Sequence, residues 1–254
     1  MDNPVSPMYI WAIALLSALA IVSGYTLHAL PISLVVAVAS AGTIEILIRN
    51  IHRRHKFKIP FSGLITGLII GSVAPINAPL ALVVVAAAIA VASKFFIQYK
   101  SSNIFNPATI GLIVALPLFG LGDEWWIASN YNFYGLAVTL TPILVILAYE
   151  AKRLTTGMAF VLASLALALA LGGTSIVSAG GIAAALFGIN YYFAFVMLIE
   201  PKTSPNGRYA QAAYGISVAA LCFALALFRV PYPLLVSLLA GNTVYLAYRS
   251  RGKR

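Results

Sequence analysis

The segment NIFNPATIGL, residues 103–112, carries the polar residues best placed to bind a ligand. Asn106 precedes Pro107, and proline suits the first turn of a helix because that position needs no N–H. Asn106 is therefore expected to be the N-cap of a helix, with Asn103 and Thr109 close to its start. A helix start offers N–H groups and a positive dipole end to a phosphate, carboxylate or carbonyl oxygen. A plain, well-capped helix has the same Asn-Pro pair, so both interpretations stay open.

A second polar segment, MLIEPKTSPNGRY at residues 197–209, ends a long apolar run. Glu200 lies beside the cation Lys202, and Thr203 and Ser204 add hydroxyl groups. A carboxylate beside cations at the end of a helix is typical of a surface ion pair. The same residues could instead hold a cofactor, an ion or a partner at the mouth of the protein.

Two other segments place Ser and Gly at the start of an apolar run. PFSGLITGLIIG (60–71) includes Ser62, Thr66 and Gly67, and SIVSAGGIAAALFG (175–188) includes Ser178, Gly180 and Gly181. Interrupted segments at matching places in two halves of a membrane protein indicate a site near the bilayer midplane. Close helix packing uses the same small residues, so that alternative also stays open. If the site exists, these openings line one cavity with residues 103–109.

No other motif in the chain points to catalysis or to a metal. A Gly-rich nucleotide fingerprint, a Walker motif and a nucleophile elbow are all missing from the sequence, so no catalytic residue is assigned. The single Cys222 excludes an internal disulfide and a multi-Cys metal cluster held by this chain alone, and no metal site is predicted. Glu45 precedes Arg49 by four residues, which predicts an ion pair on one helix face.

Apolar runs of membrane-spanning length separate these polar segments and define the fold class. Hydrophobic residues make up 61% of the chain, charged residues 9%, and the mean hydropathy is +0.96, which suits a bilayer rather than water. We expect an all-α polytopic membrane protein of about ten transmembrane helices, forming a single membrane domain over residues 1–254. The third run is short, which predicts an interrupted or re-entrant piece. The runs are approximately 7–28, 30–48, 59–74, 79–98, 104–121, 133–150, 157–172, 176–199, 209–228 and 232–248.

The positive charge predicts the orientation. Fifteen of the sixteen Lys and Arg residues fall on one side of this threading, with Lys94 snorkelling to that side and Arg229 alone opposite. The positive-inside rule makes that side the cytoplasm and places both termini there. The membrane is then expected to be the inner (cytoplasmic) membrane of the cell. Trp125 and Trp126 fall on the outer side, where they indicate an interfacial anchor. The cations are scattered over five short segments, which argues against a nucleic-acid partner. Membrane lipid is the partner that this pattern predicts.

Ten crossings divide into two sets of five, about residues 7–121 and 133–248. Because each set holds an odd number of spans, the second must enter the membrane from the other side. If the two sets are repeats, they are inverted repeats.

Three motifs in order resemble one known family. They are Ser-x-x-x-Thr-Gly-Leu at Ser62–Leu68, Asn-x-Phe-Asn-Pro-Ala at Asn103–Ala108, and Pro-x-Thr-Ser-Pro at Pro201–Pro205. The chain is similar in these stretches to the D subunit of the Rnf ferredoxin:NAD oxidoreductase and the B subunit of the sodium-translocating NADH:quinone reductase. The resemblance implies a urea-transporter-like fold of two inverted five-helix repeats.

The resemblance also implies a flavin, FMN joined to a Thr in a Ser-Gly-Ala-Thr type motif, with a second flavin or a quinone in some members. No Gly-Ala-Thr occurs between Ala108 and Glu200, so we expect non-covalent FMN or riboflavin, or a quinone. Electrons would arrive from other redox subunits or from a cytosolic flavin or iron–sulfur reductase, coupled in some form to ion transport. The alternative is a small-solute channel or transporter that kept the fold without a cofactor. The residues expected to line the cofactor site are Ser62, Thr66, Gly67, Asn103, Asn106, Pro107, Thr109, Ser178, Gly180, Gly181, Glu200, Lys202, Thr203 and Ser204.

Overall fold

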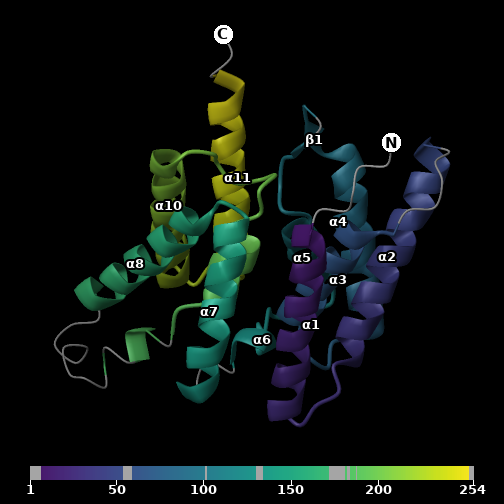
Figure 1. Cartoon of the computed structure of the whole chain (residues 1–254), viewed down its shortest axis with the longest axis horizontal. Coiled ribbons are helices and arrows are strands. Elements are labelled where there is room, and N and C mark those ends of the chain that lie inside the picture. The colour runs from purple at the N-terminus through teal and green to yellow at the C-terminus, as the bar shows by residue number, and fades with distance from the viewer. Residues whose placement is uncertain are drawn as a thin grey trace. The chain divides into compact units, whose positions relative to one another are not determined.

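The computed structural model describes residues 7–53, 59–100, 102–129, 134–171, 181, 184–186 and 188–251. Most of this part of the chain is helical, and the only described strands are two strands of two residues each, which form one hairpin (Figure 1). The chain divides into two compact units, Met1–Asn130 and Tyr131–Arg254. The boundary between the units falls between the two expected five-helix sets.

The first unit is built from five longer helices, one short helix and a hairpin. Its hairpin pairs Gln98 with Asn103 and joins α4 to α5. The elements are α1 (Pro7–Thr26), α2 (Ile32–Arg53), α3 (Phe61–Val73), α4 (Leu80–Phe96), β1 (Gln98–Tyr99), β2 (Ser102–Asn103), α5 (Pro107–Leu118) and α6 (Trp126–Ser129).

Small residues allow these helices to approach closely. Helix α2 packs on α3 and α4, and α4 packs on α5. Gly67 on α3 faces the backbone of α2, where an added Cβ would lie 2.6 Å from the Ala37 carbonyl oxygen. Gly111 on α5 faces the Ala86 carbonyl of α4 in the same way. A larger side chain at either position would push two helices apart, which explains glycine inside apolar helices.

The elements with given bounds in the described part of the second unit are four longer helices and one π-helical turn. They are α7 (Tyr134–Glu150), α8 (Leu154–Leu171), η3 (Phe193–Met197), α10 (Arg208–Leu227) and α11 (Pro233–Arg251). Helix α8 packs on α10 and η3, and α10 packs on α11. Gly157 on α8 faces the Phe195 ring of η3, and Gly215 on α10 faces the backbone of α8 at Thr156.

The same order of contacts occurs in both units. In the first, the second helix packs on the third and the fourth, and the fourth packs on the fifth. In the second, α8 packs on η3 and α10, and α10 packs on α11. Two copies of one five-helix unit would produce this pattern. The inverted orientation of the copies stays a prediction.

Nine of the ten expected apolar runs contain a helix of the structure, within a few residues. The eighth run, 176–199, lies largely outside the described residues, and its described end contains η3. Helices α1, α2, α8 and α10 are long and apolar enough to cross a membrane, whereas α3 and α5 have only 13 and 12 residues. At about 1.5 Å per residue, α3 and α5 are too short to cross a bilayer core of about 30 Å. The chain is thus a multi-pass all-α membrane protein, and the short α3 agrees with the interrupted piece expected there.

Candidate functional site

The start of α5 is capped as its sequence predicts. Asn106 has extended backbone angles, and its Oδ1 accepts a hydrogen bond from the Thr109 N–H at 3.2 Å. Pro107 occupies the first turn, where its missing N–H costs nothing. The N-cap prediction is confirmed, and the cap satisfies one of the N–H groups that a bound oxygen would otherwise use.

A buried hydroxyl remains at this helix start. Thr109 is completely buried, and its Oγ1 has no hydrogen-bond partner within the described ranges. Asn103 and Asn106 are also buried, with 6% and 2% of their surface exposed. A buried polar group without a partner is rare in folded proteins, because it loses its hydrogen bonds to water without replacement. The start of α5 therefore offers an unused hydrogen-bonding group inside the first unit.

A charged cluster lies at the start of α3, where Ser62 was predicted to bind a ligand. The Lys94 ammonium on α4 donates to the Ser62 carbonyl at 2.8 Å and to the Ser62 hydroxyl at 2.9 Å. It also lies 3.4 Å from Glu45 Oε2 on α2, and Glu45 pairs with Arg49 as the four-residue spacing predicts. Glu45 is 1% exposed and Lys94 is 8% exposed. The cluster thus connects α2, α3 and α4 through ionised groups removed from solvent.

Two expectations about this cluster need correction or refinement. Lys94 does not snorkel to the surface: its ammonium is held inside by Glu45 and Ser62. Thr66 is buried and donates to the Ser62 carbonyl at 2.9 Å, while Gly67 lies against the backbone of α2. From the sequence, Lys94 served only as a topology marker and Glu45 only as the partner of Arg49 on one helix face. Their position inside apolar runs was a usable signal, because ionisable residues within membrane segments are costly and usually functional.

The clusters at α3 and α5 lie at the same end of the first unit. Gln98 on β1 donates from its side chain to the Lys94 carbonyl, and its backbone pairs with Asn103 on β2. Asn103 in turn stands three residues before the α5 cap. The structure thus connects Ser62 through Lys94 and Gln98 to the predicted site residues at 103–109.

In the second unit, Arg153 donates hydrogen bonds to three residues of the loop that contains Pro201–Pro205. Its Nε donates to Ser204 Oγ at 3.0 Å, and its Nη2 donates to the Asn206 side chain and to the Pro201 carbonyl. Arg153 is 7% exposed, and burial lowers the pKa of its guanidinium from the usual value. The sequence analysis counted Arg153 only as a cation on one side and missed this role.

The same loop is held from its other side by α11. Asn242 is fully buried and donates to the Thr203 carbonyl at 3.2 Å and to the Tyr214 phenol oxygen at 2.8 Å. The Glu200 carboxylate accepts a hydrogen bond from the Thr203 hydroxyl at 3.4 Å, whereas Lys202 is exposed. Thr203 and Ser204 are therefore rigidly placed, and their hydroxyls serve the loop itself.

Three of the predicted site residues belong to the eighth run. Ser178 and Gly180 lie outside the described residues, and Gly181 is described as part of a helix. The cavity expected to join 178–181 with 103–109 stays a prediction.

The loop around Trp125 and Trp126 differs from its predicted role. Trp125 and Trp126 are 8% and 1% exposed, so they are not an interfacial anchor. Trp126 Nε1 donates to the Gly71 carbonyl at 2.7 Å, and Trp125 Nε1 donates to Asp123 Oδ2 at 2.6 Å. Glu124 Oε2 accepts from the Ile76 N–H at 2.7 Å. The Trp126 ring lies against the end of α3 because its N–H finds an acceptor there, whereas the Trp125 N–H is satisfied within its own loop.

These observations define a multi-pass helical membrane protein with buried polar groups at two helix starts in its first unit. A model of the NQR2, RnfD, RnfE family matches residues 3–130, about half of the 254-residue chain, and the chain belongs to this family. It is therefore a membrane subunit of the Rnf/Nqr type, which works in a complex of several subunits. The match covers the first unit, with Ser62–Leu68 and Asn103–Ala108, and the Pro201–Pro205 motif lies beyond it. Among curated proteins, none matches the chain.

Proposed function

We propose that the chain is a membrane electron-transfer subunit that binds FMN or riboflavin non-covalently at the start of α5, with a quinone as a possible second ligand. The observation that carries the proposal is the buried Thr109 hydroxyl, which has no partner within the described ranges. Thr109 directly follows the Asn-Pro-Ala motif and lies inside the part of the chain that matches the family.

The residues at this site fit a ring carbonyl better than a phosphoester. An isoalloxazine ring carries carbonyl oxygens that accept from a hydroxyl, and the Thr109 O–H is a donor in need of an acceptor. Covalent attachment would need a Thr in the family's Ser-Gly-Ala-Thr setting, which the sequence lacks between Ala108 and Glu200. Thr109 itself follows Pro-Ala and is fully buried.

A bound flavin supplies the one- and two-electron chemistry, and the chain supplies position and electrostatics. Asn106 fixes the start of α5 through its cap, and the Thr109 hydroxyl donates to the ring. The Lys94–Glu45–Ser62 cluster holds α2, α3 and α4 in place at the same end of the unit. Electrons come from neighbouring redox subunits or a cytosolic flavin or iron–sulfur reductase on the cation-rich side. The proposal includes coupling of this electron transfer to the transport of an ion.

The test compares Thr109→Val with Thr243→Val in protein purified in mild detergent. Valine keeps the shape of threonine and removes the hydroxyl, and the exposed Thr243 hydroxyl only returns to its own helix at the Leu239 carbonyl. We expect wild type and Thr243→Val to release flavin on acid extraction, and Thr109→Val to release much less. Thr109→Val should keep or raise the melting temperature, because it removes a buried hydroxyl that lacks a protein partner.

The contrary result is equally specific. A wild-type chain that is colourless and binds neither flavin nor quinone, yet carries a neutral solute into liposomes, would establish the channel or transporter alternative. A loss of flavin in Thr109→Val together with a large fall in melting temperature would show a packing role for Thr109.

A further inference from the structure

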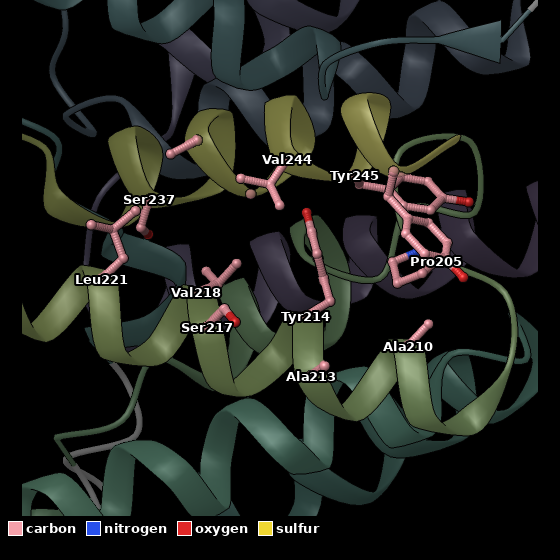
Figure 2. Close-up of a pocket in the computed structure, with 13 residues that line it drawn as sticks. Pro205, Ala210, Ala213, Tyr214, Ser217, Val218, Leu221, Ser237, Val244 and Tyr245 are labelled. Atoms are coloured by element: carbon pink, nitrogen blue, oxygen red, sulfur yellow. The ribbon is translucent and has the colours of Figure 1, made fainter. Parts of the chain in front are cut away.

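A groove of about 470 Å³ runs between α10 and α11 in the second unit (Figure 2). Ala213, Tyr214 and Val218 line it from α10, and Ser237, Val244 and Tyr245 line it from α11. The complete lining recurs every three or four positions along each helix, for example at Ala210, Tyr214, Ser217 and Leu221 on α10. Each helix therefore presents one face to the groove. Its volume lies in the range of about 300–1,000 Å³ that is usual for small-molecule sites.

The groove is polar at one end and apolar at the other. Figure 2 shows Tyr214, Tyr245 and Pro205 gathered toward one end and Leu221 and Ser237 toward the other. The Ser237 hydroxyl donates to the Leu234 carbonyl of its own helix, so it adds little polarity to the apolar end. An occupant should therefore have a long apolar part and one polar end.

Tyr214 is an incompletely used hydrogen-bonding group at the polar end. It is 8% exposed, and its phenol oxygen accepts from Asn242 Nδ2 at 2.8 Å. The phenol O–H has no acceptor in the part of the chain that the structure describes. A phenol can donate and accept at once, so this O–H is free to donate to an acceptor oxygen of a molecule in the groove.

One cation lies against the polar end. The guanidinium of Arg249 lies 5.5 Å from the centroid of the Tyr245 ring, which itself lines the groove. Arg208 begins α10 and Arg251 ends α11. The two helices are joined by the short turn 228–232 and pack on each other, so these termini lie at the same end of the pair as Arg249. The Glu200 carboxylate also lies within electrostatic range of Tyr214, so Arg249 is the cation that would have to hold an anionic headgroup there.

We propose that this groove binds one molecule of an anionic phospholipid. An acyl chain lies along Val218 and Leu221, an ester carbonyl oxygen accepts from the Tyr214 O–H, and the phosphate lies at Arg249. The order of groups along the groove, apolar wall, single donor and cation, is the order of groups along such a lipid. Basic pockets between membrane helices bind anionic headgroups by the same attraction.

The experiment measures lipid binding by native mass spectrometry on delipidated protein in detergent, with phosphatidylglycerol and phosphatidylcholine of identical acyl chains. Wild type should retain phosphatidylglycerol more strongly. Arg249→Gln should weaken phosphatidylglycerol binding about fivefold and leave phosphatidylcholine unchanged, because one headgroup contact contributes about 1 kcal/mol. Arg229→Gln, at the opposite end of the α10–α11 pair, is the matched control and should change neither.

Two further variants separate binding from folding. Tyr214→Phe removes the donor and should weaken both lipids roughly threefold to tenfold. Ser217→Phe fills the groove while leaving Tyr214 and the arginines in the sequence, and should exclude both lipids at an unchanged melting temperature. Equal retention of the two lipids by wild type, an Arg249→Gln protein that binds like wild type, or undiminished lipid binding in Ser217→Phe would overturn the proposal. Occupation of the groove by a flavin, a quinone or a second copy of the chain in place of lipid would overturn it as well.

Discussion

At the residue scale, the charged cluster around Glu45 shows how an apolar protein keeps ionised groups inside. The carboxylate is 1% exposed and lies between Arg49 on its own helix and Lys94 on α4. Gly63 makes room for it, since an added Cβ there would come 2.8 Å from Glu45 Oε2. An isolated buried charge would be costly, so each member depends on the others.

Replacing Lys94 should therefore destabilise the first unit. Lys94→Met removes one partner of a buried carboxylate, and we expect a loss of about 3 kcal/mol in the free energy of unfolding. Glu45→Gln added to Lys94→Met should recover part of that loss, because the carboxylate charge is gone. Lys100→Met is the control, since Lys100 is exposed and lies only over the Tyr99 ring. Equilibrium unfolding in mixed micelles measures these variants together with Glu45→Gln alone. A loss in the double variant equal to the sum of the two single losses would contradict the coupling.

Asp123 should make stability depend on pH. Burial raises the pKa of this carboxyl above its usual 3.8, and the hydrogen bond from Trp125 opposes the shift only in part. A carboxyl with a raised pKa is better accommodated when protonated, so its contribution is present below 3.8 and is lost as the pH rises through the folded-state pKa. As the pH is raised toward neutral, the melting temperature of wild type should therefore fall relative to that of Asp123→Asn. A flat difference, or one that grows with pH, would contradict this.

At the scale of elements, helix positions could be predicted because hydropathy and caps are local properties. The N-cap at Asn106 and the short α3 follow from residues within one turn of the chain. The hairpin of β1 and β2, the inward-turned Trp126 and the Arg153 anchor were missed. Trp126 and Arg153 depend on partners far along the sequence, Gly71 and Ser204. A linear pattern contains no information about those pairings. The hairpin is local, but its strands of two residues each are too short to show an alternating pattern.

The glycines of α3 give a test at this scale. Gly67→Ala should destabilise the first unit by about 1–3 kcal/mol, because its Cβ would meet the backbone of α2 at Ala37. Gly122→Ala is the matched control, since no atom lies within 4 Å of an added Cβ there. Thermal unfolding of the two variants measures the difference. Equal melting temperatures would mean that α2 and α3 are farther apart than the structure shows.

At the scale of the whole molecule, the two units bear on whether the chain contains a repeat, and the charge pattern bears on its orientation in the membrane. The units share an order of helix contacts, which supports a repeat of five helices but not its direction. The direction can be found from the side of the membrane on which particular residues lie. With fourteen cations on one side, leaving out the buried Lys94, and Arg229 alone on the other, we propose cytoplasmic termini and an outer loop at 119–125.

Single-cysteine labelling decides this orientation. In a Cys222→Ala background, Gly122→Cys places a thiol on an exposed loop position with open space around it, and Ser250→Cys places one on the exposed last turn of α11. A membrane-impermeant maleimide should label Gly122→Cys in intact cells and Ser250→Cys only after permeabilisation, because an odd number of spans separates the two residues in the ten-helix threading. Labelling of Ser250→Cys in intact cells would reverse the orientation. Labelling of both positions in intact cells would require an even number of spans between them, and would therefore break the five-and-five division on which inverted repeats depend.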